Sequence, residues 1–106
     1  MLLKPNDFHK ILKIIKERNS YVSISIGSEE SYVNFETSFK YISSFGDDDN
    51  GNYSIVIHNG VQNVSLYNIE FRVTPKTIIV GGENHYTLIN TENDKVKTYL
   101  EIEIND

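Results

Sequence analysis

Apolar and polar residues alternate in short runs along most of the chain after residue 20. In the most regular run, charged residues and one tyrosine alternate with Val96, Thr98, Leu100, Ile102 and Ile104. Successive side chains of a β-strand point to opposite faces of a sheet, so this alternation predicts strands with one buried face. The runs are joined by short connections, whereas parallel neighbours need crossovers of about a dozen residues. The pattern therefore predicts an antiparallel sheet.

Further strands are predicted at residues 21–26, 53–57, 69–73, 77–80 and 85–89. Turn-forming residues separate some of them at Asp47–Gly51 and at Gly81–Asn84, and the second of these predicts a hairpin. The apolar phase changes before Ile69, which predicts a bulge or a break near Tyr67 and Asn68.

The dipeptide Asn59-Gly60 predicts another hairpin. Both residues tolerate the positive φ that a type I′ turn requires. A two-residue loop here would place His58 opposite Val61 and residue 55 opposite residue 64.

The stretch from residue 31 to residue 45 admits two interpretations. Odd positions from 33 to 41 carry Val, Phe, Thr, Phe and Tyr, which predicts a strand or a bent pair of strands. The apolar positions 32, 35, 39 and 42 also fit the spacing of a helix. The abundance of aromatic, β-branched and serine residues favours strands.

Residues 1–19 are predicted to form one amphipathic helix. Pro5 suits the first helical position, and Asn6 or Asp7 is placed to cap the first turn. The spacing i, i+3, i+4 and i+7 gives an apolar stripe, widened by a fifth residue: Phe8, Ile11, Leu12, Ile15 and Ile14. So short a helix is marginal alone, so its stripe should cover the strands.

A length of 106 residues fits one domain. We expect an α+β fold in which the N-terminal amphipathic helix, residues 1–19, packs on a β-rich body, residues 20–106. The body should be a curved, mostly antiparallel β meander or a partly open barrel of about seven strands.

Several classes of protein are excluded or disfavoured by composition. Cysteine is absent, which excludes a disulfide scaffold, a thiolate zinc site and a cysteine nucleophile. No run of about 18 apolar residues is present, so no membrane span is expected. The first residues lack the apolar region of a secretion signal, which favours a cytoplasmic protein, in the host cytosol if a phage encodes it. No known catalytic or cofactor motif is present, so we expect neither enzymatic activity nor a cofactor.

Charge is distributed unevenly. Residues 1–18 carry five basic and two acidic side chains, whereas residues 19–106 carry five basic and thirteen acidic ones. Such a body should repel nucleic acid and attract a partner protein with a basic surface. Carboxylates would steer the encounter and a tyrosine would anchor it. The candidate contact residues are Asp47, Asp48, Asp49, Tyr99, Glu101 and Glu103.

Metal binding is not expected from the spacing of possible ligands. In an EF-hand alignment of the acidic turn, Gly46 takes the first ligand position and Ile57 replaces the bidentate glutamate. His9, His58 and His85 show no metal-ligand spacing.

Together these features predict a small non-enzymatic protein that binds and neutralises a larger partner. The acidity, the small size and a bias towards residues with A+T-rich codons (14 Ile, 12 Asn and no Ala) are typical of phage anti-defence proteins such as anti-CRISPRs. A basic nucleic-acid channel would be a natural target, which makes mimicry of DNA one version of the mechanism.

Three alternatives stay open. An immunity protein against a toxic nuclease would bind in the same way, through acidic side chains that meet a basic surface. A small ligand-binding barrel or enzyme would need a pocket of about 300 Å³ or more that gathers His58, His85 and a carboxylate. A phage structural subunit would show a large apolar contact between copies. The chain should be a monomer or a homodimer.

Overall fold

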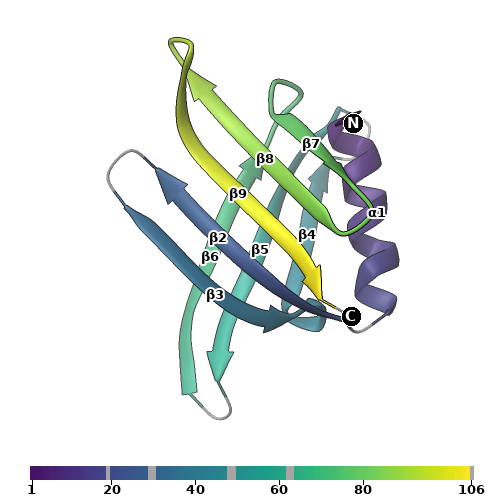
Figure 1. Cartoon of the computed structure of the whole chain (residues 1–106), viewed down its shortest axis with the longest axis vertical. Helices are drawn as coiled ribbons and strands as arrows, with labels where there is room; N and C mark the ends of the chain where they lie inside the picture. Colours follow the sequence, from purple (N-terminus) through teal and green to yellow (C-terminus); the bar gives the residue numbers. More distant parts are fainter. Residues whose placement is uncertain (19, 29–30, 48–49, 62–63, 106) are drawn as a thin grey trace.

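The computed structural model describes residues 1–18, 20–28, 31–47, 50–61 and 64–105. These residues form one α-helix, one 3₁₀ helix and nine strands in two sheets. Figure 1 shows how the helix and the two sheets are arranged. The six-stranded sheet contains, in spatial order, β1 (Leu2–Leu3), β7 (Ile78–Gly82), β8 (His85–Glu92), β9 (Lys95–Asn105), β2 (Tyr21–Ser28) and β3 (Tyr32–Ser38). The three-stranded sheet contains β4 (Ile42–Asp47), β5 (Asn52–Val61) and β6 (Val64–Val73).

The predicted α+β fold, one N-terminal helix with mostly antiparallel strands, is confirmed, and the strands divide between two sheets. All strand pairs in the described ranges are antiparallel. However, the last strand, β9, lies between β8 and β2 instead of at an edge. Strands β9 and β2 are both long and alternating. Their pairing places Ile24 opposite Ile102 and Ile26 opposite Leu100 on the buried face. Burial of these apolar pairs is the physical reason for the non-sequential order.

The stretch from residue 31 to residue 45 is a bent pair of strands, as the alternation predicted. Strand β3 belongs to the six-stranded sheet and β4 to the three-stranded sheet. Between them the chain forms the 3₁₀ helix η1 (Phe39–Tyr41), where the side chain of Ser38 accepts a hydrogen bond from the N–H of Lys40. Phe39 is buried, so this turn both changes sheets and fills the core.

The Asn59-Gly60 turn prediction is wrong. Both residues belong to β5, and His58 lies opposite Asn68 instead of Val61. The predicted register would have placed the buried Ile57 opposite a glutamine at position 62. The observed register places it opposite Ile69 and continues the apolar face of both strands. Burial of that face therefore outweighs a local preference for a turn.

A bulge does lie close to the predicted position. Asn59 pairs with Tyr67 and Val61 with Val64, so one residue of β5 faces two residues of β6, numbers 65 and 66. The extra residue is therefore on β6, directly before the predicted Tyr67 and Asn68.

Two further hairpins have two-residue turns. Gly82 pairs with His85, which confirms the hairpin predicted at residues 81–84, and Glu83 takes a φ of 35°. Between β8 and β9, Asn93 and Asp94 have φ values of 54° and 63°, the left-handed pair that a type I′ turn needs.

Helix α1 (Pro5–Glu17) closes one side of the space between the sheets. Figure 1 shows it beside β7 and β4, and it contacts β4 and η1. Pro5 is the first helical residue, as predicted, but the N-cap is Lys4 and no side chain caps the helix, so the predicted cap at Asn6 or Asp7 is wrong. The helix has thirteen residues. In the described part of the chain no helix is both long and apolar enough to span a membrane.

The buried side of α1 is rotated relative to the prediction. Phe8, Leu12 and Ile15 are buried in the core and Ile11 packs partly against it, as predicted. Ile14 is 61% exposed, and His9 on the opposite flank is buried instead. The ring of Phe8 packs edge-to-face against Tyr86 of β8, with centroids 5.3 Å apart.

Candidate functional site

Three of the six predicted contact residues lie together on one face of the six-stranded sheet. Tyr99, Glu101 and Glu103 alternate along β9 with the buried Leu100 and Ile102. Their side chains therefore point away from the core.

Neighbouring strands extend this outer face with similar residues. Across β2, the register places Glu103, Ser23 and Glu36 in one row. Further along the same face, Tyr99, Gly27 and Tyr32 form another row. Tyr21, the first residue of β2, lies on the same face. We call this surface the tyrosine–glutamate face and define it by six residues: Tyr21, Tyr32, Glu36, Tyr99, Glu101 and Glu103.

The aromatic side chains of this face are held by their neighbours. A Cβ atom at Gly27 would collide with the ring of Tyr99, so the ring lies directly over the glycine backbone. Tyr32 packs beside it, with the two ring centroids 6.5 Å apart at 34°. The hydroxyl of Tyr32 donates a hydrogen bond to Ser25 Oγ at 3.3 Å. Glycine at position 27 lets the ring approach the sheet this closely, and a larger residue would displace the ring.

Packing also changes the acidity of Tyr99. Desolvation raises the pKa of its phenol above the usual value of 10.0, and the neighbouring Tyr32 and Glu101 raise it further. The pKa is thus higher in the folded chain than in the unfolded chain. The stabilising contribution is complete below the unfolded value and is lost as pH rises through the folded value.

We expect Glu101→Gln to lower the pKa of Tyr99, because it removes a negative charge that disfavours the phenolate. Titration of the tyrosine Cζ resonances by ¹³C NMR measures the change. Glu17→Gln is the matched control, since Glu17 is an exposed carboxylate of α1 and its removal should leave the Tyr99 titration unchanged. If neither Glu101→Gln nor Tyr32→Phe moves the titration, Tyr99 does not lie where the structure places it.

The three charged residues that define this face are all glutamates. Lys97, two positions before Tyr99 on β9, is also exposed. Glu36, Glu101 and Glu103 are exposed. Tyr21 and Tyr32 are 61% and 60% exposed. The face therefore combines accessible aromatic rings with carboxylates.

Asp47, the first residue of the predicted acidic turn, is not part of this face. Asp47 ends β4 of the three-stranded sheet, where it pairs with Asn52. Its side chain, and the whole of Asp48 and Asp49, lie outside the described residues. Of the predicted contact residues that the structure describes, Asp47 lies in the three-stranded sheet and Tyr99, Glu101 and Glu103 lie in the six-stranded sheet.

The histidines do not form one site. His58 lies on β5, where its Nε2 is 3.4 Å from Ser43 Oγ, whereas His85 lies on β8 opposite Glu103. Each alternates with core residues of its own sheet, so the two side chains point away from each other. His9 is buried against the ring of Tyr53, with centroids 4.8 Å apart. In the described ranges no three His, Asp or Glu side chains are grouped as metal ligands.

A polar cleft between the two sheets was not predicted. It has a volume of about 480 Å³ and receives residues from β2, β6, β8 and β9 and from the segment that connects β6 to β7. Neither His58 nor His85 lines it. Its lining consists of Arg72, Lys76, Lys97, Glu70, Asn90, Thr74, Thr91, Thr98, Ile26 and Phe71. We call it the inter-sheet cleft.

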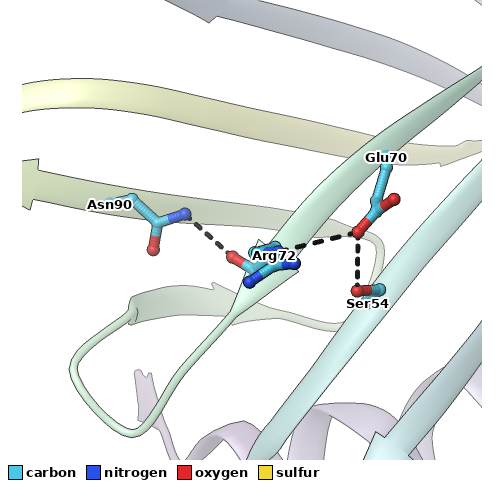
Figure 2. A network of polar contacts seen from close by, with 4 residues as sticks. All are labelled: Ser54, Glu70, Arg72 and Asn90. Carbon is cyan, nitrogen blue, oxygen red and sulfur yellow. Dashed lines mark hydrogen bonds and ion pairs between the residues drawn. The ribbon is translucent and has the colours of Figure 1, made fainter.

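Polar contacts at this cleft join the two sheets (Figure 2). Asn90 of β8 donates a hydrogen bond from Nδ2 to the carbonyl oxygen of Arg72 on β6 at 2.8 Å. Arg72 Nε lies 3.7 Å from Glu70 Oε1, and Ser54 donates to the same oxygen at 3.0 Å. Helix α1 covers the β4 side of the three-stranded sheet, so the cleft lies at its opposite edge, β6.

Sequence reasoning missed the cleft because its residues come from strands far apart in the chain. One signal was present: only five basic residues follow position 18, and Arg72, Lys76 and Lys97 are three of them. Nothing in the alternation pattern shows that these three lie around one opening.

Comparison of the chain with protein-family models, with curated proteins and with solved structures finds no match in any of the three.

Proposed function

We propose that this protein is a non-enzymatic binding module that neutralises a larger protein by covering a basic surface of it with the tyrosine–glutamate face. The observation that carries the proposal is the combination of exposed tyrosines with carboxylates on one side of a sheet. Tyrosine is enriched where interfaces gain most of their binding energy, because it buries a large area at a small entropic cost.

The strands below this face provide a rigid platform. Tyr99 is already packed over Gly27 and beside Tyr32, so part of its freedom is lost before a partner arrives. Binding then costs less conformational entropy, which favours affinity. Exposed apolar residues of β1 and β7, among them Leu2 and Val80, extend the same sheet face and enlarge the available contact area.

Carboxylates determine the kind of partner. Glu36, Glu101 and Glu103 would meet a basic surface favourably and repel an acidic one. A nuclease or another nucleic-acid-binding effector has such a surface, since it must attract phosphate. By covering the basic surface that binds nucleic acid, the protein would inhibit the partner. A phage anti-defence protein and an immunity protein against a toxic nuclease would both act in this way. The charge argument favours a protein over nucleic acid as the direct partner.

Site-directed photocrosslinking in cells of the organism that encodes the chain tests this proposal. A benzophenone amino acid replaces either Tyr21 or Tyr32 on the face, or Ile14 on the helix. Tyr21 and Ile14 have the same exposure, 61%, so the comparison separates location from accessibility. We expect one basic protein to crosslink from both tyrosine positions and not from Ile14.

Charge reversal supplies the second arm of the test. The double variant Glu101→Lys, Glu103→Lys should abolish the crosslinked product, because like charges would then meet across the interface. Circular dichroism checks that the variant keeps its fold. A product that survives the reversal, or that forms equally well from Ile14, would assign the contact to another surface. A product consisting of two copies of this chain would instead favour a structural subunit.

A further inference from the structure

We propose that the inter-sheet cleft binds a small organic dianion, a phosphate monoester attached to an apolar body. This site is separate from the tyrosine–glutamate face and does not depend on the function proposed for that face. Four observations support it: the charge of the lining, the direction of its hydroxyl groups, its size and its apolar floor.

The cleft is basic in an acidic protein. Residues 19–106 contain five basic and thirteen acidic side chains, yet Arg72, Lys76 and Lys97 line this one opening against a single carboxylate, Glu70. The lining thus carries a formal charge of two positive units, and Glu92, which pairs with Lys97, lowers the local sum to one. A phosphate monoester, with about −1.5 to −2 charges at pH 7, is attracted by this positive charge.

Existing ion pairs do not prevent such a ligand from binding. Arg72 and Glu70 are 82% and 50% exposed, and Lys97 and Glu92 are 63% and 61% exposed. Exposed pairs of this kind are weak because water screens them. A dianion that meets Lys76 and Lys97 at once can therefore compete with these pairs. Arg72 alternates with the buried Phe71 and Val73, so its guanidinium adds positive charge from the outer side of β6.

The hydroxyl groups of the cleft are arranged as donors. Asn90 Nδ2 donates to Thr98 Oγ1 at 3.3 Å, and the N–H of Lys76 donates to Thr74 Oγ1 at 3.2 Å. Each threonine oxygen already accepts a bond, so its own proton is directed towards another acceptor. A phosphate oxygen in the cleft would be such an acceptor.

The orientation of Asn90 is fixed by two further bonds. Thr77 Oγ1 accepts a hydrogen bond from the N–H of Thr74 and donates its own proton to Asn90 Oδ1 at 2.6 Å. Asn90 Nδ2 must then be the donor towards Thr98 and the carbonyl of Arg72. This network holds the cleft open in one arrangement, which favours a preformed site.

The volume of the cleft and its apolar residues indicate what the phosphate group is attached to. A volume of about 480 Å³ lies within the usual range for small-molecule sites and is larger than a free phosphate needs. Phe71 and Ile26 give the cleft an apolar part. The site therefore suits an anionic head group with an apolar body better than inorganic phosphate.

The test uses 1-naphthyl phosphate as the probe, with 1-naphthol and inorganic phosphate as its two halves. Two-dimensional ¹H–¹⁵N NMR of the full chain records saturable shifts at the amides of residues 70–76, 90–91 and 97–98. We expect 1-naphthyl phosphate to saturate these shifts with a Kd of about 1 mM or tighter. Each half alone should bind at least about tenfold more weakly.

Matched charge variants complete the test. Lys76→Gln with Lys97→Gln should weaken binding about fivefold or more, whereas Lys40→Gln with Lys95→Gln removes two lysines outside the cleft and should change it less than about twofold. Thr98→Val should weaken binding without a change in charge. The proposal is overturned if no saturable shift occurs at 10 mM, if 1-naphthol binds as well as its phosphate, or if both lysine pairs have equal effects. If a thymidine octanucleotide shifts the same amides and binds more tightly, the small-ligand proposal is wrong and the cleft binds single-stranded nucleic acid.

Discussion

Phe8→Ala should lower the free energy of unfolding by about 3–5 kcal/mol, the usual cost of truncating a buried phenylalanine to alanine. Phe8 has no exposed surface, and it connects α1 to the six-stranded sheet through its edge-to-face contact with Tyr86. Domains of this size are stable by about 5–15 kcal/mol, so the loss is a large fraction of the total. Urea denaturation followed by circular dichroism measures it.

Two companion variants show whether the cause is burial. Ile14→Ala, on the same helix, should change stability by less than about 0.5 kcal/mol, because Ile14 is 61% exposed. Phe8→Leu keeps most of the volume and should cost less than Phe8→Ala, so a measurement remains possible even if the alanine variant does not fold. Equal losses at positions 8 and 14 would contradict the described orientation of α1.

Ile14 also shows the limit of a periodicity argument. Four of the five apolar residues of the predicted stripe are buried or pack against the core, but Ile14 is exposed and the buried side extends to His9 instead. The period of the apolar residues does not determine how the helix is rotated against its neighbours. Strand β1 was missed because two residues are too few to show any period.

Strand positions were predictable because alternation is a local property, whereas strand order was not. β9 pairs with β2 across about eighty positions of sequence, and no local pattern encodes such a pairing. The Asn59-Gly60 turn failed for a related reason. A local preference was overridden by the apolar register of β5 and β6, which only the assembled sheet determines.

The candidate sites likewise divide into residues that local alternation predicts and residues that only strand pairing brings together. Tyr99, Glu101 and Glu103 could be placed on one face from the sequence, because they alternate along one strand. Their neighbours Tyr32 and Glu36 come from β3 and required the pairing of three strands. The inter-sheet cleft needed both sheets, so nothing in a single strand could reveal it.

Removal of the three carboxylates of the tyrosine–glutamate face should slow association with the partner by about tenfold or more at low salt. Steering of this kind raises association rates by about 10- to 1,000-fold, and the variant Glu36→Gln, Glu101→Gln, Glu103→Gln eliminates the local charge that produces it. Stopped-flow or surface plasmon resonance on the partner found by crosslinking measures the rate. Added salt should produce the same loss in the wild type, since the Debye length falls from about 30 Å at 0.01 M to about 3 Å at 1 M.

The association and dissociation rates should respond differently. Steering acts before contact, so the carboxylate variant should change the dissociation rate much less, whereas Tyr99→Ala should mainly accelerate dissociation because it removes packed contact area. Two matched charge variants locate the effect. Neutralising Lys10, Lys13 and Lys16 on α1 tests the basic surface, and changing residues 47–49 from Asp to Asn tests the acidic turn. If the lysine variant slows association and the carboxylate variant does not, the helix is the contact surface. An acidic partner would then replace the basic one, because a surface attracts the charge opposite to its own.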